Sequence, residues 1–294
     1  MNNDVATGDA ASVPIAILNL ERRMLDEIEA IGQARILAKS SADRWAGMYV
    51  KEFITVCDDA IPRLSREMMR LTVQKAEDLL SRPGAPLVCD ESAWIDEHFD
   101  AKDASIRRSN NYEAWTEQRE ALWSGFRPTV LWQHISAKYD PDRVVNEARE
   151  RAALTIVKTF GLYAQADIKR VSGRIELTIS RNSERVYNST LRRYSYSNYS
   201  DMAKLSSALD VFAVSAGLDQ SNVRISALGR ALLEAERHDF QFTSRDRLDF
   251  DGPLSIVFFN SEIKVYLSPE VGQALNVFLS MYAAEEMAKK SQWA

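Results

Sequence analysis

The sequence predicts an α+β protein in which an N-terminal helical bundle is followed by a mixed part with antiparallel hairpins and a C-terminal helix. In the first half, apolar residues recur at intervals of three or four, which is the period of a helix. After Gly161 the pattern changes, and residues 174–180 alternate between polar and apolar side chains, as in a strand with one buried face. The chain then closes with two apolar strand patterns and a proline-capped helix pattern.

Composition limits the kind of protein this is. The chain has 294 residues, of which 46% are hydrophobic, so it can form a substantial core. The net charge of −5 creates no overall attraction to nucleic acid or to an anionic membrane. Cys57 and Cys89 stand in no metal-binding or redox spacing, and no signal peptide or long apolar run is present. These features predict reduced thiols, a cytoplasmic location and no membrane insertion.

The first half is predicted to be a flexible tail over residues 1–12 and a mainly helical region over residues 13–164. A Pro-Gly-Ala-Pro sequence at 83–86 interrupts this region, and Asp140 with Pro141 marks a helix start. The apolar spacing predicts helices over roughly residues 17–39, 45–60, 64–79 and 141–160.

The second half, residues 165–294, is predicted to be an α+β region with two hairpins and a C-terminal helix. In the first hairpin, residues 174–180 are expected to pair with residues 184–190 across a turn near Asn182. Helices are predicted over residues 200–216 and 227–236. A second hairpin joins residues 254–259 to 263–267, and Ser268 with the proline that follows it caps the last helix.

Basic and aromatic residues concentrate in and after the first predicted hairpin. Residues 151–195 contain nine lysines and arginines against three acids, an excess of six positive charges. Guanidinium groups hold phosphates and aromatic rings stack on bases, so this mixture is typical of a nucleic-acid surface. The alternative is an ordinary exposed sheet face covered by arginine and tyrosine side chains. The predicted contact residues are Lys169, Arg170, Arg181, Arg185, Tyr187, Arg192, Arg193, Tyr194 and Tyr196.

An acidic run follows the proline break. It consists of Asp90, Glu91, Asp96, Glu97, Asp100 and Asp103. His98 lies within this run, but neither paired histidines nor a calcium-loop pattern accompanies it, so no metal site is predicted. A solvated loop is the plain interpretation, and a surface that imitates nucleic-acid charge toward a basic partner is the alternative.

Motifs for catalysis are lacking. The three histidines, His98, His134 and His238, lie in no nucleophile-activating pattern, and the dispersed glycines form no phosphate-binding loop. No cofactor and no catalytic residue are therefore predicted. A carboxylate pair assembled from distant positions stays open.

The C-terminal pattern points to a family. The relevant residues are LSIVFFN at 254–260, IKVYL at 263–267, SPEV at 268–271, Asn276, and RIEL at 174–177. Over about the last 130 residues this layout resembles a family of uncharacterised proteins carried by phages, plasmids and integrative elements, a domain of unknown function sometimes found near DNA-methyltransferase sequences. Asn260-Ser261 stands where that family tends toward Asn-Gly. The resemblance implies a mobile-element setting and transfers no catalytic residue.

Three functional hypotheses follow from the sequence. The leading one is a non-enzymatic mobile-element accessory protein that binds nucleic acid or a nucleoprotein complex through the basic, tyrosine-rich patch. The second is an anti-defence protein that inhibits a host protein complex through the acidic run or the helical half. An enzyme acting on DNA or nucleotides ranks lowest. Leu18 and Leu25, beside the main apolar stripe of the first helix, also suggest pairing into a homodimer.

Overall fold

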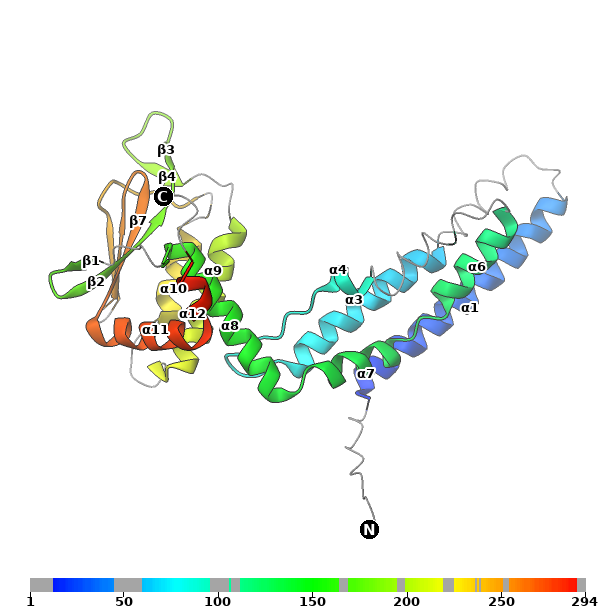
Figure 1. The fold of residues 1–294 in the computed structure, drawn as a ribbon. Helices are drawn as coiled ribbons and strands as arrows, with labels where there is room; N and C mark the ends of the chain where they lie inside the picture. Colours follow the sequence, from blue (N-terminus) through cyan, green and yellow to red (C-terminus); the bar gives the residue numbers. More distant parts are fainter. Residues whose placement is uncertain are drawn as a thin grey trace, which may run out of the picture. The chain divides into compact units, whose positions relative to one another are not determined.

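A computed structural model describes most of the chain (Figure 1). The described residues are 13–44, 60–95, 106, 112–163, 169–194, 199–218, 225–235, 237, 239–250 and 254–289. Contacts divide the chain into two compact units, residues 1–81 with 86–143 and residues 82–85 with 144–294. The first unit is helical and the second contains sheet and helices, so the predicted α+β class is confirmed.

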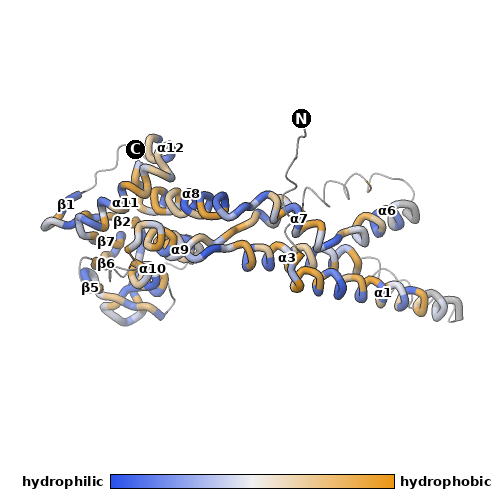
Figure 2. Tube along the Cα trace, turned by 90° about the horizontal axis from the view of Figure 1, so that it is seen from below, coloured by the Kyte–Doolittle hydropathy of each residue, from blue (hydrophilic) through white to orange (hydrophobic). Residues whose placement is uncertain are grey.

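The first unit is a helical assembly centred on α3. Helix α3 contacts α1, α4, α6 and α7. Hydrophobic and hydrophilic residues alternate along α1 and α3, as one-sided burial of a helix requires (Figure 2). The predicted helices at 17–39 and 64–79 are confirmed by α1 and α3, whereas the helix predicted at 45–60 lies almost entirely outside the described residues. The bounds are α1 Ile15–Arg44, α3 Ala60–Leu80, α4 Glu91–Ile95, α6 Tyr112–Ser124 and α7 Pro128–Lys138.

Hydrogen bonds between part-buried or buried polar groups connect these helices. The Glu21 Oε2 atom on α1 accepts hydrogen bonds from Thr129 N at 2.9 Å and from Thr129 Oγ1 at 2.5 Å, in the first turn of α7. Ser65 Oγ on α3 donates to the carbonyl of Trp123 at 2.8 Å. These bonds satisfy polar groups that the apolar contacts would otherwise leave unpaired.

Helix α8, Pro141–Phe160, begins in the first unit and packs in the second. Asp140 Oδ1 accepts from the backbone amides of Asp142 and Arg143, both at 3.0 Å, so the predicted cap with proline in the first turn is confirmed. The buried side of α8, including Ala153 and Ile156, belongs to the core of the second unit. The packing boundary at residue 143 therefore precedes the change from helix to strand, which follows Phe160.

The second unit is built on an antiparallel sheet of five strands in the order β1-β2-β7-β6-β5. Helices α8, α9, α10 and α11 lie on one side of this sheet in both views (Figures 1 and 2). The strands are β1 Lys169–Val171, β2 Arg174–Ser180, β5 Arg247–Phe250, β6 Leu254–Phe258 and β7 Glu262–Leu267. The helices are α9 Tyr199–Ser215, α10 Ile225–Glu234, α11 Pro269–Tyr282 and α12 Ala284–Met287.

Alternation along the central strands sets the two faces of the sheet. Leu177 on β2 and Ile256 on β6 both stand opposite Val265 on β7, and all three are buried in the core. Their neighbours Lys264 and Tyr266 point to the opposite face, because successive side chains of a strand alternate. The helices cover only the apolar face.

The pairing predicted for the first hairpin is wrong. Strand β2 pairs with β1 across a turn at Ser172 and Gly173, whose φ angles are 51° and 76°, and with β7 on its other side. Residues 183–185 instead form β3 (Ser183–Arg185), which pairs with β4 (Arg192–Tyr194) in a separate two-stranded sheet. The apolar row of β2 needs an apolar row beside it, and the polar strand β3 offers none.

The C-terminal hairpin and helix are confirmed. Strands β6 and β7 pair across the predicted turn. Ser268 Oγ accepts from the amide of Val271 at 3.2 Å, with Pro269 in the first turn of α11. Among the described helices, none is long and apolar enough to cross a bilayer.

Helices α9 and α10 approach closely at Gly229. A Cβ atom at this position would lie 3.2 Å from the Cα of Ser206 and 3.3 Å from its carbonyl oxygen. Because these are backbone atoms of the facing helix, a larger side chain must separate the two helices.

We therefore predict that Gly229→Leu lowers the free energy of unfolding by about 1–3 kcal/mol. Arg230→Leu is the matched control, since Arg230 is exposed on the same helix, and its effect should stay within about 0.5 kcal/mol. Urea unfolding followed by circular dichroism measures both. Equal stability of the two variants would contradict the close contact at Gly229.

Candidate functional site

The β3–β4 hairpin is attached to the core through Tyr194. This side chain is 5% exposed, and its ring stacks on Phe242 with centroids 4.6 Å apart. Its hydroxyl donates to the carbonyls of Phe259 at 2.9 Å and Glu262 at 3.2 Å. Burial raises the pKa of the Tyr194 hydroxyl far above its ordinary value, so the group stays a neutral donor. Tyr194 therefore stabilises the hairpin and offers no ring to a ligand.

Two predicted contact residues, Arg192 and Arg193, make bonds within the hairpin. Arg192 donates from Nε to Ser183 Oγ at 2.8 Å and from Nη2 to the Ser183 carbonyl at 2.9 Å. Arg193 pairs with Glu184 across the strands at 2.7 Å. Their guanidinium groups thus help to hold β3 against β4.

The tip of the hairpin is exposed. Arg185 ends β3, and Tyr187 in the turn is 90% exposed. Asn188 follows with a φ of 54°, a left-handed conformation that asparagine tolerates in turns. A cation and an aromatic ring are consequently presented together at this tip.

A polar groove lies at the base of the hairpin. It has a volume of about 600 Å³ and is formed by the end of α8, the end of β2 and the start of α9. Lys158, Arg181 and Lys204 line it, one from each of these segments. Its remaining lining residues are Thr155, Thr159, Phe160, Gly161, Thr178, Ile179, Ser180 and Asp201.

The charge of this groove is positive. Its three cations face one carboxylate, Asp201, which lies 3.9 Å from Arg181. Within the described residues, no carboxylate lies at salt-bridge distance from Lys158 or Lys204, and Glu286 interacts with Lys158 only at longer range, where the lysine helps to lower the pKa of the Glu286 carboxyl. Like charges that converge in a recess repel each other, and a bound anion would relieve this repulsion. Ammonium, guanidinium and hydroxyl donors are the groups that bind phosphate oxygens.

The outer face of the large sheet is electrostatically different. Lys264 lies 3.0 Å from Glu176 on β2 and 3.5 Å from Glu262, and Arg247 pairs with Asp249 at 2.7 Å. Lys264 and Arg247 on this face already have carboxylate partners. Burial of Glu176 raises the pKa of its carboxyl, but hydrogen bonds from Lys264 and Tyr266 outweigh burial and leave the pKa below its ordinary value.

The two predicted cations on β1, Lys169 and Arg170, lie on opposite faces of the sheet. Lys169 stands opposite Glu176, which belongs to the outer face, whereas Arg170 stands opposite Ile175, on the face toward α11. Tyr196 lies outside the described residues. Of the predicted set, Arg181 lines the groove, and Arg185 and Tyr187 lie in the hairpin that follows it in the chain.

The acidic run is described only at its start. Asp90 Oδ1 accepts from Ser92 Oγ at 2.6 Å and from the amide of Ala93 at 3.1 Å, at the beginning of α4. These hydrogen bonds lower the pKa of Asp90. Glu91 is the first residue of α4. Asp96, Glu97, His98, Asp100 and Asp103 lie outside the described residues, and the part of the chain that is described contains no group of three metal-ligating side chains.

The two lysines of the groove were not predicted as site residues. Lys158 counted only toward the local charge excess, and Lys204 lies beyond that segment. Both are exposed residues on amphipathic helices, and such positions carry no distinctive sequence signal. On α1, Leu18 and Leu25 are 48% and 42% exposed, and the homodimer stays a prediction.

Comparison with protein-family models, with curated proteins and with solved structures finds no match for this chain.

The Glu176–Lys264 pair makes the stability of the fold depend on pH. Because the pKa of Glu176 is below its unfolded value of 4.5, the pair stabilises the fold above that pH, and this stabilisation is lost as the pH falls through the lowered pKa. Glu176→Gln should therefore reduce the free energy of unfolding by about 1–3 kcal/mol at neutral pH and by less in acid. Urea unfolding at neutral and acidic pH measures the difference.

Glu184→Gln is the control for this measurement. It removes the exposed partner of Arg193, so its effect should stay below about 1 kcal/mol. A Glu176→Gln loss that is equal at both pH values would refute the assignment.

Proposed function

We propose that this protein binds nucleic acid, with backbone phosphates in the groove at the base of the β3–β4 hairpin. The observation that carries the proposal is the convergence of Lys158, Arg181 and Lys204 from three separate segments. Contacts to phosphates supply most of the affinity in nucleic-acid complexes and require only correctly placed cations. The net charge of the whole chain does not oppose this, because the contact is local.

The hairpin supports a polymer as ligand in preference to a single phosphate. Arg181 lies two residues before β3, so the groove and the hairpin are continuous along the chain. A nucleic-acid strand that is held in the groove and runs along the hairpin would meet Arg185 and then Tyr187. The exposed tyrosine ring can stack on an unpaired base, and this favours single-stranded nucleic acid.

The proposal includes the setting that the C-terminal resemblance implies, an accessory protein of a phage, plasmid or integrative element. The rival hypothesis, inhibition of a host protein complex, depends largely on the acidic run. Only Asp90 and Glu91 of that run are described, and Asp90 is engaged at the start of α4. The positive groove therefore gives nucleic-acid binding the stronger physical support.

The first test is a salt series with the full chain and a fluorescently labelled oligothymidylate, followed by anisotropy. The double variant Lys158→Gln/Lys204→Gln should bind about tenfold more weakly at low salt. The slope of log affinity against log salt should fall by about 0.7 for each lost contact. Arg230→Gln is the matched control, because it removes an exposed cation from α10, and it should bind like the unaltered protein.

Two results would reject the groove as the binding site. One is the absence of oligonucleotide binding at low salt. The other is an equal loss of affinity in Arg230→Gln and in the double lysine variant, since that would indicate a general charge effect.

The second test concerns base stacking at the hairpin tip. Tyr187→Ala should weaken single-strand binding about fivefold or more and leave duplex binding unchanged, whereas Tyr187→Phe should retain single-strand binding. Anisotropy with a single strand and with its duplex measures both. Equal losses for the two ligands would argue against stacking.

A further inference from the structure

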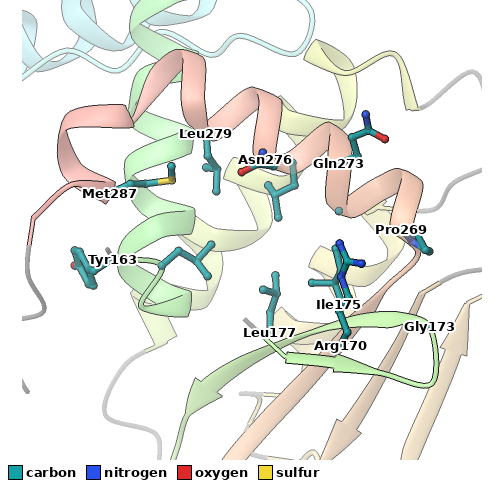
Figure 3. Close-up of a pocket in the computed structure, with 13 residues that line it drawn as sticks. Tyr163, Arg170, Gly173, Ile175, Leu177, Pro269, Gln273, Asn276, Leu279 and Met287 are labelled. Atoms are coloured by element: carbon teal, nitrogen blue, oxygen red, sulfur yellow. The ribbon is translucent and has the colours of Figure 1, made fainter. Parts of the chain in front are cut away.

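A second cavity lies on the helix-covered side of the sheet, and the proposed function does not use it. Its volume is about 700 Å³, and it opens between the β1–β2 hairpin and α11, with α12 and the segment after α8 at its other end (Figure 3). Pockets for small organic ligands fall in this size range. Most of its lining is apolar, contributed by Leu162, Ile175, Leu177, Leu275, Leu279 and Met287.

The close approach of α11 to the hairpin bounds this cavity at one end. A Cβ atom at Gly272 would lie 2.0 Å from Ile175 Cδ1, so the helix touches the hairpin there with only a glycine between them. Farther along the helix, Leu279 points down toward the cavity while Leu177 points up into it from the strand (Figure 3). The space between these side chains is apolar and is bounded by regular elements.

Arg170 is the single charged residue among those that line the cavity. It stands directly opposite Ile175 in the β1–β2 register, and cross-strand partners share a face of the sheet. Its guanidinium group extends from the hairpin toward α11 (Figure 3). Within the described part of the chain, no carboxylate pairs with it, and Asn276 adds an amide from the helix side.

We propose that this cavity binds a small amphipathic carboxylate, with the carboxylate on Arg170 and the apolar body against Leu177 and Leu279. The planar guanidinium matches a carboxylate with two parallel hydrogen bonds. A single cation suits a monoanion, and the absence of acidic residues from the lining removes any competitor for it. The apolar body of the ligand displaces water from the apolar lining, and the removal of both apolar surfaces from water favours binding. This site shares no residue with the groove, so it is independent of nucleic-acid binding.

Isothermal titration of the full chain with decanoate tests the proposal, with 1-decanol as the neutral ligand of the same length. Decanoate should saturate one site, and decanol should bind at least about tenfold more weakly, because it lacks the charge-assisted bonds to Arg170. Failure of decanoate to saturate a site at millimolar concentration would overturn the proposal.

Three variants locate the binding. Arg170→Gln should weaken decanoate by about ten- to a hundredfold and leave decanol unchanged. Lys169→Gln is the matched control, because this neighbour in β1 faces the other side of the sheet, and it should bind decanoate normally. Asn276→Trp places a large ring beside the cavity from an exposed position on α11 and should weaken both ligands. Normal decanoate binding by Arg170→Gln, or by Asn276→Trp, would refute this assignment.

Discussion

The burial of one face of the large sheet beneath α8, α9, α10 and α11 is the constraint on which the second unit depends. Leu177, Ile256 and Val265 meet in this layer, and each such side chain contributes about 1.5–3 kcal/mol when it leaves water. A slip of one residue in any strand would exchange the buried row for the polar row. The register is therefore fixed by the same apolar contacts that stabilise the unit.

Both proposed sites take residues from β2 or from the segment that directly follows it. Leu177 lines the apolar cavity, and Arg181, just past the end of the same strand, lines the groove. Helix α8 and the segment after it also serve both sites, since Lys158 lies in the groove and Leu162 in the cavity. Each of these residues lies in a regular element or within two residues of its end, so the packing of these elements in the core helps to position the charged groups.

The parts of the fold that depend on neighbouring residues were predictable from the sequence. The β6–β7 hairpin, the Ser268 cap and the start of α8 at Pro141 follow from turn and cap chemistry that acts over a few residues. The pairing of β2 was not predictable in this way. Its partner β7 begins more than eighty residues later, and an apolar strand pattern does not specify which other strand it joins.

The residues of the candidate site were likewise only partly predictable from the sequence. The concentration of arginine and tyrosine directed attention to the hairpin region, but whether each of these side chains is buried, paired or exposed depends on residues far away in the sequence. Tyr194 is buried because Phe242 stacks on it, and Lys204 enters the groove because α9 begins beside the end of β2. Such long-range contacts arise from tertiary packing, and the composition of one segment does not predict them.

The attachment of the small β3–β4 sheet has a consequence for amide hydrogen exchange. Two strands of three residues are marginally stable alone and would exchange at the rate of a fraying loop. Here the amides of Arg192 and Phe242 donate to each other's carbonyls at 2.8 Å and 2.9 Å, and the Phe242 ring is buried in the core against Tyr194. The Arg192 amide can exchange only when Phe242 leaves the core, so it belongs to the slow cooperative unit, whereas the amide of Tyr187 in the turn does not.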